Sequence, residues 1–330
     1  MVGRRLAETV LRDGTLGGQP VDALTAFDVV KAGLSTPDKV VELAGDISDR
    51  ATVDRLVADR PDVIFHLAAI VSGEAEADFD KGYAINMDGT RHLFEAIRAQ
   101  GSDYHPRVVY TSSIAVFGAP FEDKITDTFI TAPMTSYGAQ KMIGELLLND
   151  YSRKGFFDGV GIRLPTIVVR PGKPNKAASG FFSGIIREPL AGLDAVLPVE
   201  DGVRHWVASP DAAVGFLLHA AAMDTAGLGA RRCLTMPGLC VSITEMIEAL
   251  RAVAGDASVA HIKRQPDATI RGIVAGWPQD FAPDRALAAG FTADADFQSI
   301  IRAHLRDTAV SALPHDAGTG AQSRDADAPA

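Results

Sequence analysis

A tyrosine and a lysine four residues apart, Tyr137 and Lys141, form a pair that could do acid–base chemistry. They lie in the segment 136–155, where apolar residues recur at helical spacing, so both side chains are expected on one face of a helix. A free tyrosine has a pKa of about 10 and is a poor base at neutral pH. A nearby ammonium group favours the phenolate and would lower that pKa, so the pair could accept a proton from a hydroxyl group.

A second chemical feature is the serine pair in "TSSIAVFG", Ser112 and Ser113. The segment 107–113 reads as a strand, and Ser113 stands at its end. Open α/β sheets bind their ligands at the carboxyl ends of their strands. Ser113 is therefore a candidate for contact with a bound molecule.

Strand-like and helix-like segments alternate through the first half of the chain and would position these residues. The expected strands are 22–30, 40–48, 62–69, 107–113 and 159–169, and the expected helices are 51–59, 83–101 and 136–155. Strands that are apolar along their whole length and alternate with helices imply a parallel sheet covered on both faces. The sequence predicts an α/β fold, a Rossmann-type doubly wound parallel sheet.

The pattern changes near residue 170, which predicts a smaller second lobe. Residues 1–169 would form the dinucleotide-binding domain and residues 170–313 mainly a substrate-binding lobe, with 205–238 returning to the first domain. Capped helices are expected at 209–223 and 242–255. The segment 314–330 is small, polar and without periodicity, so we expect it to be disordered.

The composition excludes several classes of protein. A formal net charge of −10 argues against nucleic acid or an anionic membrane surface as a partner. No apolar run reaches the roughly 18 residues that span a bilayer, and charges interrupt the start too early for a signal peptide. Cys233 and Cys240 are too few for a disulfide framework, and we read them as reduced thiols of a cytoplasmic protein. The histidines show no metal-ligand spacing, so no metal is expected.

The first fourteen residues read as an amphipathic helix with a glycine, Gly3, in its first turn. In a dinucleotide-binding domain the third glycine of the phosphate-binding turn occupies that place. Asp28 ends an apparent strand about 25 positions later, which suits the acidic residue that binds the adenosine ribose. The first strand and most of the glycine-rich turn therefore look missing. The sequence suggests a reading frame that starts roughly ten residues upstream, and a chain that as written folds poorly or binds NAD weakly.

Seven motifs in a fixed order carry a resemblance to a known family: "FDVV" (27–30), "GDISD" (45–49), "HLAA" (66–69), "NMDGT" (86–90), "YTSSIAVFG" (110–118), "YGAQK" (137–141) and "IRLPTIVVRPG" (162–172). From residue 1 to about 310 the chain resembles the extended short-chain dehydrogenase/reductases, also called the NAD-dependent epimerase/dehydratase family. Within that family "VRHWVASPDAAVGFLLHAA", "LTMPGL" and "IVAGWPQDF" are most similar to the D-erythronate dehydrogenases.

The resemblance implies catalytic roles for three residues. Ser113 would hydrogen-bond the reacting oxygen, and Tyr137 would be the base. Lys141 would lower the tyrosine pKa and bind the nicotinamide ribose. Ser112 would be structural or would contact the substrate. The motif lacks the Thr-Asp-Glu that sugar dehydratases of the family carry, so dehydration is disfavoured.

The resemblance also implies that NAD is the cofactor. Asp28 would accept hydrogen bonds from the adenosine ribose and repel a 2′-phosphate, which selects NAD over NADP. Asn86 resembles a helix asparagine that is usually structural and would otherwise touch the cofactor. The remaining expected cofactor contacts are Gly3, Asp46, Ile47, Leu67, Ala68, Ala69, Pro165 and Ile167.

The substrate is expected to be a small hydroxy acid. One cation among Arg170, Lys173 and Arg204 would hold its carboxylate, although each could instead be solvated surface charge. Ser72 is a further expected substrate contact. The expected reaction is NAD-dependent oxidation of D-erythronate to 2-dehydro-D-erythronate. The alternatives are a nucleotide-sugar 4-epimerase and a non-catalytic NAD-binding regulator, and a homodimer is possible because dimers are common in the family.

Overall fold

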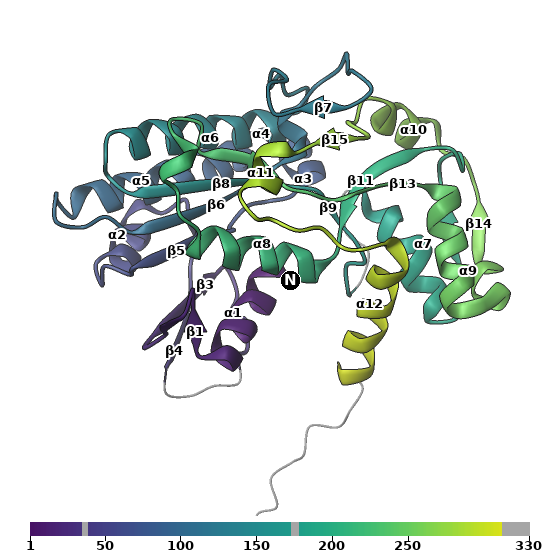
Figure 1. The fold of residues 1–330 in the computed structure, drawn as a ribbon, viewed down its shortest axis with the longest axis horizontal. Coiled ribbons are helices and arrows are strands. Elements are labelled where there is room, and N and C mark those ends of the chain that lie inside the picture. Colours follow the sequence, from purple (N-terminus) through teal and green to yellow (C-terminus); the bar gives the residue numbers. More distant parts are fainter. Residues whose placement is uncertain (35–38, 173–177, 312–330) are drawn as a thin grey trace, which may run out of the picture.

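The computed structural model describes residues 1–34, 39–172 and 178–311 of the chain (Figure 1). In the first half the elements are α1 (Val2–Asp13), β1 (Thr15–Leu16), β2 (Gln19–Pro20), β3 (Leu24–Asp28), β4 (Val40–Ala44), α2 (Arg50–Val57), β5 (Val63–His66), α3 (Ser72–Ala77), α4 (Phe79–Gly82), the π-helical turn η1 (Tyr83–Asp88), α5 (Gly89–Ala99), β6 (Arg107–Ser113), the 3₁₀ turn η2 (Ile114–Val116), β7 (Ile125–Thr126), α6 (Ser136–Arg153), β8 (Asp158–Leu164) and β9 (Thr166–Ile167). In the second half they are α7 (Gly180–Leu190), β10 (Ala195–Leu197), β11 (Arg204–Ala208), α8 (Pro210–Ala222), the 3₁₀ turn η3 (Ala226–Leu228), β12 (Cys233–Thr235), β13 (Leu239–Ser242), α9 (Ile243–Val259), β14 (Ile262–Arg264), α10 (Ala268–Ala275), β15 (Phe281–Ala282), α11 (Asp284–Ala288) and α12 (Phe297–Ser311). None of the described helices is both long and apolar enough to cross a lipid bilayer.

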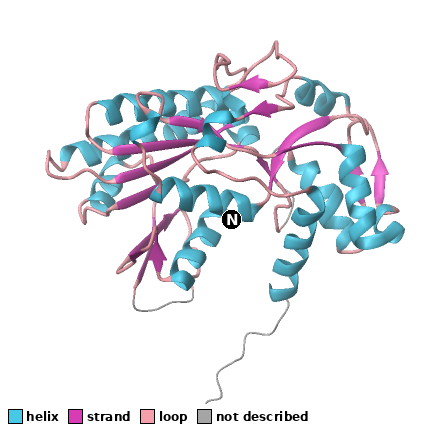
Figure 2. Ribbon diagram, viewed as in Figure 1, coloured by secondary structure: helices cyan, strands magenta, loops and turns pink. Residues whose placement is uncertain are grey.

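The central layer is a four-stranded parallel sheet in the order β12–β8–β6–β5 (Figures 1 and 2). Along β6, Val108 and Tyr110 pack in one core with the apolar side chains of α5 and α6. Val109, which points to the opposite face, packs with those of α8. Helices thus cover both faces of the sheet, and the predicted doubly wound α/β fold is confirmed.

The first two expected strands form a separate layer. β3 and β4 pair in parallel over the whole length of both strands, from Leu24 opposite Val40 to Asp28 opposite Ala44. This pair forms a two-stranded sheet of its own and makes no ladder with the four-stranded sheet. A large cavity lined by residues 24–28 and 63–66 lies between it and β5.

The second half of the chain builds a smaller lobe, here called the C-terminal lobe, beside the main sheet. β11 pairs in parallel with β9 and antiparallel with β13, and α7, α9 and α12 cover this three-stranded sheet (Figure 1). Its core includes Val168, Phe182, Leu197, Met246 and Ile301. Two elements from the same half belong to the main sheet instead. Strand β12 pairs with β8, and helix α8 packs on β8 and β6.

The amphipathic helix α1 packs its apolar side on α8. Leu6 and Val10 are buried in one core with Phe216. Arg5 extends the contact, because its guanidinium pairs with Asp211 at the start of α8 and with Asp307 in α12 (Nη1 to Oδ2, 2.5 Å). One arginine near the start of the chain thus connects three helices.

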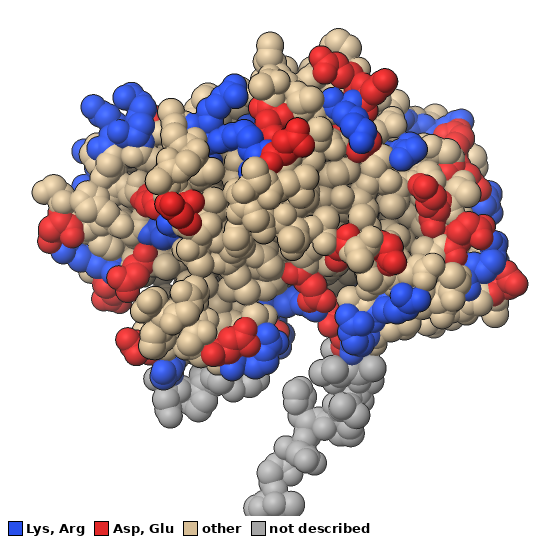
Figure 3. Space-filling view, in the orientation of Figure 1, with Lys and Arg blue, Asp and Glu red and all other residues tan. Residues whose placement is uncertain are grey.

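Charged side chains of opposite sign are interspersed on the face of the molecule in Figure 3. Blue Lys and Arg side chains alternate with red Asp and Glu around its rim, and the centre of this face is uncharged. A nucleic-acid-binding face gathers basic residues into one patch or stripe. This face of the molecule does not.

Candidate active site

A cavity of about 1,970 Å³ runs from α1, β3 and β5 to the C-terminal lobe and is here called the main cavity. Its wall includes the carboxyl ends of β3, β5 and β6, where a doubly wound sheet binds its ligands. A cavity of this volume exceeds the usual range for one small ligand. Part of this volume is the gap between β3 and β5, because residues 59–63 at the amino end of β5 also line the cavity.

Ser113, Tyr137 and Lys141 all line the main cavity. Ser113 is the last residue of β6, and its side chain accepts a hydrogen bond from the Ala115 amide (3.1 Å). The other two lie one turn apart in α6, as their spacing predicts. Lys141 Nζ donates to the carbonyl oxygen of Thr111 in β6 (2.9 Å) and lies 5.8 Å from the centroid of the Tyr137 ring.

Burial dominates the acid–base properties of this group. It raises the pKa of Tyr137 to about 12, against which a hydrogen bond with Ser113 acts to lower it. Burial also lowers the pKa of Lys141 to about 8. The predicted lowering of the tyrosine pKa by the lysine is therefore not found. The physical reason is that burial penalises the charged phenolate.

Behind the serine pair lies a buried ion pair that the sequence does not reveal. Ser112 Oγ donates to Glu145 Oε1 (2.5 Å), and Glu145 pairs with Arg163 (Oε2 to Nη2, 2.7 Å). Glu145 is one turn beyond Lys141 in α6, and Arg163 is in β8. These contacts fix the end of β6 against α6, where Ser113 must be held.

The cofactor residues expected from the sequence divide into two sets. Those that line the main cavity are Gly3, Asp28, Asp46, Ile47, Leu67, Ala68, Ala69, Pro165 and Ile167. Asn86 is not among the described lining residues. It lies in η1, where its Oδ1 accepts from the Ile70 amide (2.9 Å) and its Nδ2 donates to Gln140 Oε1 (2.8 Å). Asn86 thus supports the cavity wall from behind.

The single helix predicted for 83–101 is divided in the structure into the π-helical turn η1 and the α-helix α5.

The donor and acceptor groups of the wall fit a dinucleotide. Asp28 presents an exposed carboxylate at the carboxyl end of β3, suited to a ribose diol. The amino end of α1 also lines the cavity, with no side-chain cap among the described residues, so its free amides suit a pyrophosphate. A Cβ on Gly3 would lie 3.7 Å from Leu67, an ordinary contact, so packing does not require glycine there.

The expected substrate residues are separated by the structure. Ser72, Ser112 and Arg170 line the main cavity. Arg204 is not among the described lining residues, is exposed, and donates from Nε to Cys240 Sγ (3.3 Å). Lys173 lies outside the described residues.

The structure adds a polar wall around Arg170 that the sequence did not indicate. Arg170 Nη2 donates to Ser179 Oγ (3.1 Å), its amide donates to Ser183 Oγ (3.1 Å), and its carbonyl oxygen accepts from Arg187 (2.7 Å). All four residues line the main cavity, as does His205. Burial, with a smaller contribution from Arg187, lowers the pKa of Arg170. A partly buried guanidinium of this kind favours an anionic ligand.

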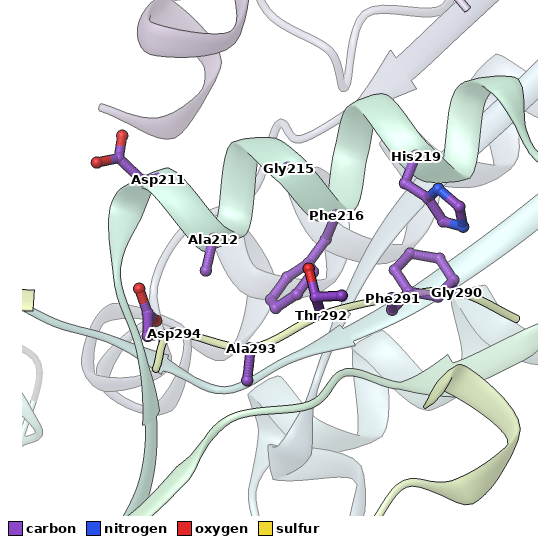
Figure 4. A pocket seen from close by; sticks show the side chains of 10 residues that line it. All are labelled: Asp211, Ala212, Gly215, Phe216, His219, Gly290, Phe291, Thr292, Ala293 and Asp294. Atoms are coloured by element: carbon purple, nitrogen blue, oxygen red, sulfur yellow. The ribbon is translucent and has the colours of Figure 1, made fainter. Parts of the chain in front are cut away.

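A second cavity, of about 290 Å³, lies between α8 and residues 290–294 (Figure 4). His219 Nε2 lies 2.7 Å from the Ala289 carbonyl oxygen, and its ring packs edge-on against Phe291. Asp294 accepts from the amide (2.8 Å) and the hydroxyl (2.6 Å) of Ser209, the N-cap residue of α8. These side chains attach α8 to the segment before α12.

Among the described residues, no cluster of three or more His, Cys, Asp or Glu could hold a metal ion.

Known proteins similar to this chain match it over most of its length. The model of the NAD dependent epimerase/dehydratase family matches residues 1–229. D-erythronate dehydrogenase of Cupriavidus necator is 46% identical over 314 residues, or 94% of this chain and 96% of that protein. The enzyme of the same name from Haemophilus influenzae is 42% identical over 302 residues, or 91% and 94%. A solved structure described as a nucleoside-diphosphate-sugar epimerase from Agrobacterium tumefaciens is 56% identical, with a TM-score of 0.91, over 95% of this chain and 93% of that one.

Proposed function

The chain belongs to the NAD-dependent epimerase/dehydratase family and is an NAD-dependent oxidoreductase that acts on a CH–OH group; from that premise we propose that it oxidises D-erythronate to 2-dehydro-D-erythronate. One observation carries the proposal: Tyr137 and Arg170 line the same cavity. A base and an anion-binding group in one cavity suit a substrate with a hydroxyl next to a carboxylate. The two relatives named D-erythronate dehydrogenase support the choice of acid.

In this mechanism Tyr137 Oη accepts the proton of the substrate hydroxyl. Ser113, which acts to lower the pKa of Tyr137, would hold the same substrate oxygen. Lys141, protonated below pH 8, favours the phenolate and would bind the nicotinamide ribose of NAD. When bound, NAD supplies the hydride acceptor. Because the pKa of Tyr137 is about 12, only a small fraction is phenolate at neutral pH, and oxidation is expected to accelerate as the pH rises towards 8.

Arg170 is the cation that we assign to the substrate carboxylate. It lines the main cavity, whereas Arg204 points to Cys240 on the surface. Ser179 and Ser183 orient it, and a guanidinium can bind a carboxylate through two parallel hydrogen bonds. Ser72 and Ser112 are assigned to the substrate side of the same cavity.

Asp28 is assigned to the adenosine ribose and the amino end of α1, with Gly3, to the pyrophosphate. Asp46 and Ile47 would flank the adenine, and Leu67, Ala68, Ala69, Pro165 and Ile167 would lie along the rest of the cofactor. The chemistry of these groups supports the assignment, because each lines the main cavity. The division into a dinucleotide-binding domain (1–169) and a mainly substrate-binding region (170–313) belongs to the same proposal.

A second candidate is a nucleotide-sugar epimerase, favoured by the description of the Agrobacterium structure. An epimerase returns the hydride to its substrate and accumulates no reduced cofactor. A regulator that binds NAD without turnover is disfavoured by the Ser113, Tyr137 and Lys141 set.

The proposal also includes a cytoplasmic location, which the free thiols Cys233 and Cys240 support, and a homodimer. Light scattering would test the dimer.

The test is NADH formation at 340 nm when the purified chain receives NAD and D-erythronate. We expect steady NADH formation, with a KM for the acid that rises about 10- to 100-fold in Arg170→Ala. Arg204→Ala is the matched control, because it removes an arginine outside the cavity, and it should leave KM unchanged. No NADH from D-erythronate, together with interconversion of a nucleotide sugar, would replace this proposal by the epimerase.

A further inference from the structure

The end of the main cavity in the C-terminal lobe contains an indole whose hydrogen-bond donor is unused. Trp277, two residues after α10, lines the cavity together with Gly276 and Pro278. Its Nε1 has no hydrogen-bond partner among the described residues and, unlike Nδ1 of His205, is not enclosed by protein atoms. We infer that Trp277 donates from Nε1 to a hydroxyl oxygen on the substrate carbon next to the reacting one, and that this end of the cavity selects a hydroxyl over an ammonium group there. This inference rests on the proposed function.

The Trp277 ring is held between the core of the C-terminal lobe and the main cavity. Its backbone amide donates to the Val274 carbonyl oxygen in α10 (3.0 Å), which fixes the position of the residue. The ring packs against that core and lies 5.3 Å from the His205 ring, at an interplanar angle of 37°. These contacts are apolar or aromatic, so they leave the N–H group without a protein acceptor.

The other tryptophan of the chain shows how a satisfied indole is arranged. Trp206 is 6% exposed, is not among the described lining residues, and donates from Nε1 to the Met236 carbonyl oxygen (3.2 Å). Indole N–H groups removed from bulk water are usually hydrogen-bonded in this way. Trp277 differs in having both an accessible N–H group and a place on the cavity wall, so its acceptor is expected to come from a bound molecule.

The charges of the cavity wall disfavour an ammonium group as that acceptor's neighbour. The described carboxylates that line the main cavity all come from residues 22–62, and they are Asp22, Asp28, Asp46, Asp59 and Asp62. Beyond residue 62 the described lining residues with a full charge are Lys141, Arg170 and Arg187, which are all cations. An ammonium group at this end would meet charges of its own sign and no carboxylate. Arg170 takes the substrate carboxylate, and the neutral indole donor suits the oxygen of a neutral hydroxyl.

The test uses three acids that share the carboxylate and the hydroxyl at carbon 2 but differ at carbon 3. D-glycerate carries a hydroxyl there, D-lactate a hydrogen, and isoserine of the same configuration an ammonium group. Isothermal titration calorimetry on the protein holding NADH, which prevents turnover, gives the dissociation constant of each acid. Trp277→Phe keeps an aromatic ring and removes the N–H group. Trp206→Phe, the same change at the indole that donates to Met236, is the matched control.

We expect the unchanged protein to bind D-glycerate about 3- to 10-fold more tightly than D-lactate, and isoserine more weakly than either. Trp277→Phe should abolish the difference between the first two acids and change the dissociation constant of D-lactate less than about twofold. Trp206→Phe should leave all three values unchanged. Equal binding of D-glycerate and D-lactate by the unchanged protein, a preference for D-glycerate that survives in Trp277→Phe, or isoserine bound as tightly as D-glycerate would refute the inference and leave the proposed function standing. The proposed function is refuted separately, by the absence of NADH formation from D-erythronate.

Discussion

Replacing Lys141 by methionine is expected to stabilise the folded protein at neutral pH while it removes the activity. Lys141 is 3% exposed, and burial lowers its pKa from 10.5 to about 8. The folded state therefore holds the lysine proton less tightly than the unfolded state does. At a cost of 1.36 kcal/mol per pKa unit, the buried charge lowers the free energy of unfolding by about 3 kcal/mol at pH 7.

The sign follows from the order of the two pKa values. This destabilisation is fully present below pH 8, where both states are protonated. It decreases to about 2 kcal/mol at pH 9 and to less than about 0.5 kcal/mol near pH 10.5, as the unfolded state also loses the proton. Methionine removes the charge but also the hydrogen bond to Thr111, a loss of about 1 kcal/mol. The variant should be more stable by about 2 kcal/mol at pH 7 and slightly less stable near pH 10.5.

The assay is urea unfolding of both proteins without NAD at pH 7, 9 and 10.5. Lys154→Met, at an exposed position just beyond the end of the same helix α6, is the matched control. The difference in free energy of unfolding between this variant and the unchanged protein should not vary with pH. A Lys141→Met variant less stable than the unchanged protein at pH 7, or a difference independent of pH, would refute the reasoning. In that case the lysine would not be held as an unfavourable buried charge.

Three further predictions concern the same cavity. Tyr137→Phe should lower kcat by about 10²- to 10⁴-fold, because it removes only the hydroxyl that accepts the proton, and unchanged turnover would contradict the mechanism. Asp28→Ser should reduce the preference for NAD over NADP at least about fivefold, measured as the ratio of the two kcat/KM values, since a carboxylate no longer repels the 2′-phosphate. Glu145→Gln should lower the free energy of unfolding by about 3–5 kcal/mol, because it leaves the Arg163 charge buried without its partner. Thermal unfolding would show this as a fall in Tm of about 6–20 °C, and a fall below about 2 °C would contradict it.

The strands, the helices and the Tyr137–Lys141 pair could be predicted from the sequence because they depend on local patterns. Apolar runs and helical spacing place β6, α6 and α8 within two residues of their observed ends, whereas the single strand expected over 159–169 is divided into β8 and β9, which lie in different sheets. The four-residue spacing in α6 likewise brings Tyr137 and Lys141 to one wall of the cavity.

What the sequence could not supply depends on contacts between distant segments. The spacing of Tyr137 and Lys141 says nothing of how deeply each is buried, so the expected pKa of Tyr137 had the wrong direction. Arg170 and Arg204 look alike as cations in a sequence, and only the fold turns one into the cavity and the other to the surface. The burial of His205 between β9 and α7 likewise cannot be recognised until these elements pack around it.

The contacts of Arg5 have a consequence for the order in which the molecule forms. Its partner Asp307 is 302 positions further along the chain. At about 5–20 residues per second, a ribosome adds that partner roughly 15–60 s after Arg5 itself. During this time α1 can pack on α8 once that helix is made, but the connection to α12 cannot form. Arg5 can therefore pair with Asp211 as soon as α8 is made, but its second ion pair forms only in the finished chain, which places the joining of α1 to α12 among the last steps of biosynthetic folding.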